Sequence, residues 1–160
     1  MLVGGCAKGG SSTAAPGENG DTSQATTDTL PRGAIDDPAS PENAAEVVRQ
    51  YYAAIDAGDY RGAYELWGGE GSASGKTLDE FVAGFQHTSQ TEATVGEPGR
   101  VEGAAGSRYV EVPVTIRAVT DHGEEQRFSG HYVMRRVVVD GATEAQGRWH
   151  IDSAKIKSTR

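Results

Sequence analysis

The fold is decided by the stretch RYVEVPVTIRAVT, residues 108–120, in which apolar and polar side chains alternate. A period of two is typical of a β-strand that buries one face and exposes the other. The buried face would carry Val110, Val112, Val114, Ile116 and Ala118. Since one polar face is the norm for antiparallel sheets, this stretch predicts a strand of such a sheet.

The turn after this strand predicts how the next strand pairs with it. Residues 121–123 (DHG) form a predicted three-residue hairpin loop, with Gly123 in the left-handed conformation. Such a loop places Ile116 opposite Phe128. The apolar residues of both strands then share one face, so the turn and the hydrophobic pattern agree.

Three helices are predicted ahead of these strands, and further strands around them. Ser40 is a good N-cap for the first helix, and Thr77 with Glu80 forms a capping box for the third. The predicted helices lie at residues 41–57, 59–67 and 77–85, and the remaining strands at residues 91–101 and 148–156. This order predicts an α+β domain over residues 41–160 with its helices packed on one face of the sheet.

Two parts of the domain resemble the nuclear transport factor 2-like (NTF2-like) superfamily. The first is residues 47–67, with YYAAIDAGDY at 51–60, and the second comprises FSGHYV (128–133) and WHI (149–151). The resemblance implies a cone fold, in which three N-terminal helices pack on a strongly bent antiparallel sheet of about four strands. A pocket often lies between the helices and the sheet of such folds.

The superfamily includes ketosteroid isomerases, polyketide-cyclase-like enzymes, dehydratases and many noncatalytic domains. Enzymes of the isomerase type need a carboxylate base inside the cone. The helical acids of this chain are expected to face solvent, and these are Glu42, Glu46, Asp56 and Glu65. A noncatalytic domain is therefore the expectation. The alternative is a small-molecule enzyme, similar to an isomerase, cyclase or dehydratase, that uses a pocket in the cone.

Aromatic side chains are the candidate wall of such a pocket, because tyrosine and tryptophan suit a small amphipathic ligand. The candidate ligand-binding residues are Tyr52, Tyr64, Trp67, Phe85, Tyr132 and Trp149. Aromatics at helical or strand spacing more often simply fill a core, and this is the alternative.

The opposite face of the sheet is polar and basic. The candidate partner-binding residues are Tyr109, Arg117, Arg127, His131 and Arg135. The predicted register places Arg117 opposite Arg127, which is unfavourable unless Glu125 or Glu111 compensates. This face could hold an acidic envelope protein or a second copy of the chain; the alternative is an ordinary solvated strand face.

The chain begins MLVGGC, and Cys6 is its only cysteine. Apolar residues, then two small residues and a cysteine, are typical of the end of a lipoprotein signal peptide, so Cys6 is the candidate lipid-attachment residue. We interpret residues 1–6 as the remnant of that peptide and residues 7–40, poor in large apolar side chains, as a disordered tether. Ala7 in place of an aspartate favours the outer membrane, facing the periplasm.

Composition and spacing exclude other classes of function. The net charge of −8 argues against nucleic acid as a partner. His131 and His150 would lie on the order of 16 Å apart along the strands, too far to share a metal ion. We therefore expect no metal and no cofactor. The predicted partners are the membrane, through the lipid, and either a small apolar ligand or an envelope protein.

Overall fold

The first helix, α2 (Pro41–Asp56), begins at its predicted cap, where the Ser40 hydroxyl accepts a hydrogen bond from the Asn43 N–H at 3.1 Å. The computed structural model describes residues 37–159. Cys6 and most of the predicted tether lie outside the described residues. Within the described range, no helix is long and apolar enough to cross a membrane.

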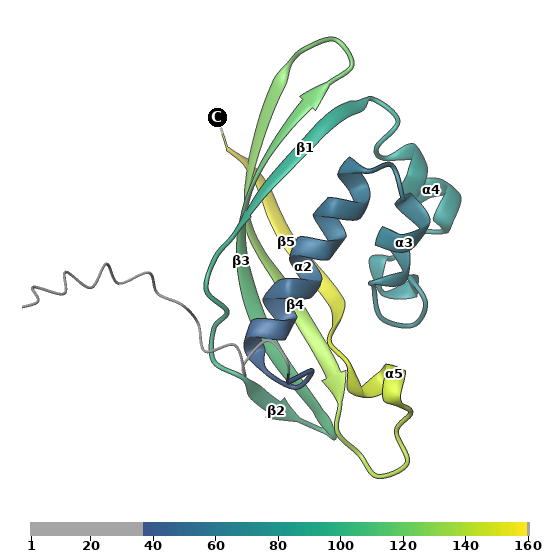
Figure 1. The fold of residues 1–160 in the computed structure, drawn as a ribbon, viewed down its shortest axis with the longest axis vertical. Coiled ribbons are helices and arrows are strands. Elements are labelled where there is room, and N and C mark those ends of the chain that lie inside the picture. Colours follow the sequence, from purple (N-terminus) through teal and green to yellow (C-terminus); the bar gives the residue numbers. More distant parts are fainter. Residues whose placement is uncertain (1–36, 160) are drawn as a thin grey trace, which may run out of the picture.

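Short helical segments follow α2 and lie on the same side of the sheet (Figure 1). They are α3 (Tyr60–Glu65), the 3-10 turn η1 (Ser72–Ser74) and α4 (Leu78–Ala83). The predicted capping box is confirmed, since Thr77 and Glu80 exchange side-chain-to-backbone hydrogen bonds at the start of α4. The third helix is shorter than predicted, and the sequence patterns did not predict η1 or a further helix, α5 (Glu144–Gly147).

One antiparallel sheet forms the other layer. Its strands are β1 (Thr88–Val95), β2 (Glu102–Ala104), β3 (Ser107–Thr120), β4 (Glu125–Val137) and β5 (His150–Thr159), in the order β1-β3-β4-β5 with β2 also paired to β3. The strand predicted within residues 91–101 overlaps β1 alone, which starts earlier and ends at Val95, and β2 was not predicted. The α+β class and the antiparallel sheet are confirmed, with five strands in place of about four.

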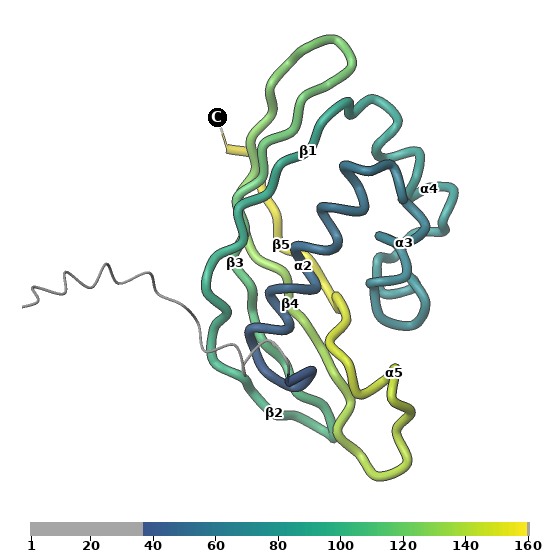
Figure 2. Tube along the Cα trace, viewed as in Figure 1, coloured from purple at the N-terminus to yellow at the C-terminus, as the bar shows by residue number. Residues whose placement is uncertain are grey.

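The predicted register of the long hairpin is confirmed. Ile116 pairs with Phe128 and Arg117 pairs with Arg127, and Gly123 in the turn has a φ of 81°. The hairpin extends beyond the rest of the sheet at one end of the molecule (Figure 2). Because the period is two, this register turns every even-numbered residue of Val110–Ala118 towards the helices, where all five are buried.

The sheet bends around α2, so that the helices fill its concave side (Figure 1). Gly130 lies in the middle of β4 at the level where β5 crosses closely. A Cβ atom there would lie 2.0 Å from the Lys155 carbonyl oxygen, so no other residue fits without a shift of the strand. At the other end of the core, the Trp149 indole N–H donates to the Ser40 carbonyl oxygen at 2.8 Å and joins the last strand to the start of α2.

Candidate functional site

The interior of the cone holds a cluster of aromatic rings, which we call the aromatic cluster: Tyr51, Tyr52, Trp67, Phe81 and Tyr132. All five are buried, and the Tyr51 ring lies at the centre. Its centroid is 5.0–6.3 Å from those of the other four, in edge-to-face arrangements. Such contacts stabilise a packed core beyond the burial of area alone. The rings therefore occupy the space between α2 and the sheet.

Three tyrosine hydroxyls lie inside this cluster. The hydroxyl oxygens of Tyr52 and Tyr132 are 2.6 Å apart and hydrogen-bonded. Burial raises the pKa of Tyr51, Tyr52 and Tyr132 well above the ordinary value of tyrosine, and the neighbouring hydroxyls raise those of Tyr51 and Tyr132 further. All three groups are therefore neutral at physiological pH and can donate a hydrogen bond but cannot act as a base.

The acidic groups of the helices lie at the surface or at its margin. Glu42 and Glu46 are half-buried on α2, whereas Asp56 and Glu65 are exposed. Asp56 accepts a hydrogen bond from the Thr91 N–H at 3.2 Å and so joins the end of α2 to β1. Among residues 37–159, the buried polar or charged residues other than tyrosine and tryptophan are Ser40, Thr91 and Ser107, none of which is a carboxylate or a histidine.

The structure brings together only some of the six candidate ligand-binding residues. Tyr52, Trp67 and Tyr132 belong to the aromatic cluster, while Tyr64 and Phe85 pack at its edge between the short helices. The Trp149 indole N–H donates a hydrogen bond to the Ser40 carbonyl oxygen. None of the six lines the surface cleft described below or either of two smaller surface pockets in residues 37–159. Their observed role is packing.

The outer face of the sheet carries the five candidate partner-binding residues, and three of them, Arg117, Arg127 and His131, lie beside acidic partners there. Glu125 bonds both arginines of the facing pair, at 2.8 Å from the Arg117 Nε and 2.7 Å from the Arg127 Nε. These bonds, that of Arg127 first, lower the pKa of the Glu125 carboxyl. His131 lies 3.4 Å from Glu111. The like-charge repulsion in the predicted register is thus compensated by Glu125.

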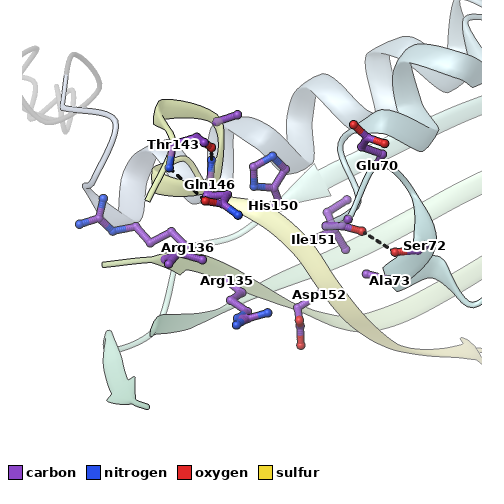
Figure 3. A pocket seen from close by; sticks show the side chains of 14 residues that line it. Glu70, Ser72, Ala73, Arg135, Arg136, Thr143, Gln146, His150, Ile151 and Asp152 are labelled. Carbon is purple, nitrogen blue, oxygen red and sulfur yellow. Dashed lines mark hydrogen bonds between the residues drawn. The ribbon is translucent and has the colours of Figure 1, made fainter. Parts of the chain in front are cut away.

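A surface cleft of about 660 Å³ lies at the other end of the sheet (Figure 3). Its walls are the loop that follows α3, the end of β4, the short helix α5 and the start of β5. The side chains that give the cleft its chemistry are Glu70, Ser72, Arg135, Arg136, Thr143, Gln146, His150 and Asp152. Of these residues, only Arg135 was predicted to bind a partner, and it was predicted on the outer face of the sheet, whereas His150 was considered only as a metal ligand and rejected.

Two backbone features build this cleft. The chain after α3 pairs with β5, where the Ile151 N–H donates to Leu66 and the Gly68 N–H donates to Ile151, both at 2.9 Å. Asp152 is the extra residue of a β-bulge in β5, because Ser153 pairs with Val133 and Ile151 with Met134. Bulges often lie beside functional sites, where they redirect a side chain.

The loop wall has an unusual backbone. Gly69, Glu70 and Gly71 have φ angles of 62°, 55° and 97°, so three successive residues are left-handed. Glycine adopts this conformation freely, whereas a glutamate there is strained. The two glycines around Glu70 are the only signal in the sequence that points to this loop. In residues 37–159, no group of three or more His, Cys, Asp or Glu side chains is placed to hold a metal ion.

Comparison with solved structures identifies the architecture. A candidate scytalone dehydratase from Novosphingobium aromaticivorans has a TM-score of 0.51 and 12% identity, over 72% of this chain and 80% of its own. A nuclear transport factor 2-like superfamily protein from Salmonella enterica serovar Typhimurium has a TM-score of 0.51 and 14% identity, over 75% of this chain and 91% of its own. The domain has the NTF2-like fold. No family model and no curated protein matches the sequence.

The NTF2-like fold accommodates both enzymes and noncatalytic domains, so it does not by itself assign an activity. In this domain the aromatic cluster fills the cone, and a surface cleft lies at the edge formed by β5 and the loop after α3.

Proposed function

We propose that this NTF2-like domain is a noncatalytic binding domain that works through its surface and is held at the bacterial cell envelope by a lipid on Cys6. The observation that carries the proposal is the filled cone. Five aromatic rings pack there, and two of them share a hydroxyl–hydroxyl hydrogen bond of 2.6 Å. A ligand inside the cone would have to displace this packing.

The chemistry of the interior supports the noncatalytic part of the proposal. Proton abstraction in a buried pocket needs a base whose pKa lies near the working pH. The ionisable groups of the aromatic cluster are tyrosines, whose pKa values burial raises away from neutrality. The hydroxyls of Tyr52 and Tyr132 form an internal hydrogen bond, and all three rings pack in the core.

Two surface regions remain for binding. The outer face of the sheet offers the basic residues of β3 and β4, and the cleft offers a concave site with polar groups from three segments. The outer face fits an envelope protein or a second copy of the chain, which could form a homodimer through the sheet. The cleft fits a small ligand, because binding sites for small molecules are concave and carry a few well-placed polar groups.

The envelope part of the proposal rests on the sequence. Cys6 follows two small residues and precedes a segment without large apolar side chains up to residue 29, as expected for a lipid-bearing cysteine and its tether. Ala7 favours the outer membrane with the domain in the periplasm. An anchor of this kind would hold the binding surfaces near the membrane without restricting their orientation.

Lipid attachment is tested by placing the basic and apolar parts of a lipoprotein signal peptide ahead of Met1 and expressing the chain in a Gram-negative bacterium. Mass spectrometry should find a diacylglyceryl group on Cys6, and the protein should fractionate with membranes. The Cys6→Ser variant should be released to the soluble fraction. A wild-type chain that is neither acylated nor membrane-bound would contradict the anchor.

Binding without turnover is tested with the full chain carrying Cys6→Ser. Native mass spectrometry against a mixture of small polar metabolites should show retained ligands of unchanged mass after long incubation. A ligand converted into a product, with the conversion abolished by a substitution in the cleft, would refute the noncatalytic function.

An enzyme that uses the cleft is the second candidate. The observation that favours it is the presence of His150 together with the carboxylates of Glu70 and Asp152 on the walls of one cleft. The His150 Nδ1 lies 3.0 Å from the Arg148 carbonyl oxygen, which can only accept, so Nδ1 is the donor of this bond and Nε2 takes no part in it. The turnover assay above, repeated with His150→Asn, distinguishes the two functions.

A further inference from the structure

We propose that the cleft between the loop after α3 and the start of β5 binds a zwitterionic ligand, namely an amino acid or short peptide with a free amino group and a free carboxylate. The inference rests on the proposed binding function and names the class of its ligand. It is carried by the charges that line the cleft, by how each is held, and by the size of the space.

The charges of the cleft are balanced and unpaired. Arg135 and Arg136 contribute two positive charges, and Glu70 and Asp152 contribute two negative charges. Within residues 37–159, none of these four side chains forms an ion pair with another residue. An anionic ligand would be attracted by the arginines and repelled by the carboxylates, and the reverse holds for a cationic ligand. A ligand that carries both charges can form a favourable electrostatic interaction with each pair.

The two guanidinium groups are held in place by neutral partners. Arg136 donates to the Gly147 carbonyl oxygen at 3.0 Å and lies over the Trp149 ring, 5.8 Å from its centroid. Arg135 donates from Nε to the Ser107 hydroxyl at 3.1 Å. Both groups keep free N–H donors and their full charge. A fixed guanidinium fork with free donors matches the geometry of a carboxylate.

The acidic groups come from two other segments. Glu70 stands on the loop between two left-handed glycines, and Asp152 is presented by the bulge of β5. Figure 3 shows Glu70 at the opposite end of the cleft from Arg136, with His150 and Gln146 between them. An ammonium group at Glu70 and a carboxylate at Arg136 would therefore place the rest of the ligand along the middle of the cleft.

The middle of the cleft offers neutral hydrogen-bonding groups. The Gln146 side-chain oxygen accepts from the Thr143 N–H at 3.0 Å, which leaves its amide NH₂ as a donor. In the neutral tautomer that carries its proton on Nδ1, the Nε2 of His150 is an acceptor. A donor and an acceptor side by side suit the C=O and N–H of a peptide bond. A volume of about 660 Å³ accommodates a short peptide and lies within the usual range for ligand sites.

The test is a titration followed by ¹H–¹⁵N NMR, with the full chain carrying Cys6→Ser and with tri-alanine as the probe. Saturable shifts are expected in residues 68–73, 135–136 and 143–152. N-acetyl-tri-alanine and tri-alanine amide, which each lack one terminal charge, should bind about ten-fold more weakly. Absence of saturation, equal affinity for all three peptides, or shifts confined to the outer face would each overturn the inference.

Substitutions in the cleft test which charged residue binds each end of the peptide. Glu70→Gln should weaken binding of tri-alanine about ten-fold and leave the affinity for the N-acetyl form unchanged, because that form has no ammonium group. Arg136→Gln should weaken binding of tri-alanine about ten-fold and leave the affinity for tri-alanine amide unchanged, because the amide has no carboxylate. Arg135→Gln is a second variant for use if Arg136→Gln perturbs the spectrum through Trp149. Glu92→Gln, an exposed glutamate on β1, is the matched control and should change nothing.

The outcome separates this inference from the function on which it rests. If tri-alanine fails to bind while another metabolite binds without turnover, the ligand class is wrong and the binding function stands. If tri-alanine binds at the cleft and is hydrolysed, the ligand class is right and the noncatalytic function is wrong.

Discussion

The aromatic cluster inside the cone and the cleft at the edge of the sheet differ in almost every property. The cluster is closed, is formed by rings from α2, α4, β4 and the loop after α3, and has the hydroxyls of Tyr52 and Tyr132 bonded to one another. The cleft is open, is lined by four charges without ion-pair partners in the described residues, and is built by loops and strand ends. The packed interior that stabilises the domain is therefore separate from the cleft that we propose as its binding site.

The largest effect on stability is expected from a cavity made at Trp149, which packs in the core and lies beneath Arg136 of the cleft. Trp149→Ala removes a side chain that is 2% exposed and the hydrogen bond to the Ser40 carbonyl oxygen. We expect a loss of about 3–5 kcal/mol in the free energy of unfolding. Urea denaturation of the full chain measures it. Trp149→Phe, which keeps most of the volume, should lose distinctly less; equal losses would contradict the cavity argument.

Alkaline pH should weaken the aromatic cluster through its three buried tyrosines. Because the pKa values of Tyr51, Tyr52 and Tyr132 are raised in the folded state, the unfolded chain releases these protons first, near the ordinary tyrosine pKa. Their contribution to stability is fully present below about pH 10 and falls above it, by up to about 1.4 kcal/mol per tyrosine per pH unit. Urea unfolding at successive pH values checks this. The Tyr52→Phe variant should show a shallower decline, and an unchanged slope would refute the assignment.

Removal of a single hydroxyl tests how much the hydrogen bond between Tyr52 and Tyr132 contributes to stability. Tyr52→Phe leaves the Tyr132 hydroxyl without its 2.6 Å partner in a buried place. We expect a loss of about 1–3 kcal/mol, and the double variant with Tyr132→Phe should recover part of it. A double-mutant cycle by urea denaturation measures the coupling, and strictly additive losses would show that the hydroxyls are not coupled.

The smallest effect is expected in the cleft. Glu70→Gly removes a left-handed glutamate with a φ of 55° and replaces it with the residue that adopts this conformation freely. The free energy of unfolding should stay within about 1 kcal/mol of the parent, while peptide binding weakens. Thermal unfolding and the NMR titration measure the two properties on one sample. A large destabilisation would mean that the cleft residues support the fold.

Much of the fold could be predicted because it follows local rules. Ser40 begins α2 through its own side chain, and Gly123 makes the hairpin turn, so each can be recognised within a few residues. Once that turn is fixed, the period of two determines every pair in the hairpin, including the facing pair Arg117 and Arg127. The aromatic residues of the core were likewise visible from their spacing, although spacing cannot show whether they enclose a pocket or fill it.

The cleft could not be predicted because its walls meet through contacts between distant segments. The loop after α3 reaches β5 through backbone hydrogen bonds at Ile151, and backbone groups leave no pattern in the sequence. The bulge at Asp152 shifts the pairing register of β5 by one residue, and the alternation of side chains in the sequence does not predict this shift. Likewise, β2 is three exposed residues whose pairing depends on β3.

The bond between the Trp149 indole and the Ser40 carbonyl oxygen has a mechanical consequence. Ser40 is the residue at which the chain enters α2, and Trp149 immediately precedes the last strand. A force applied through the preceding chain, as a lipid tether would apply it, therefore reaches β5 at once as well as α2. The load is shared between the first and last elements of the domain, so the helix is not peeled away turn by turn.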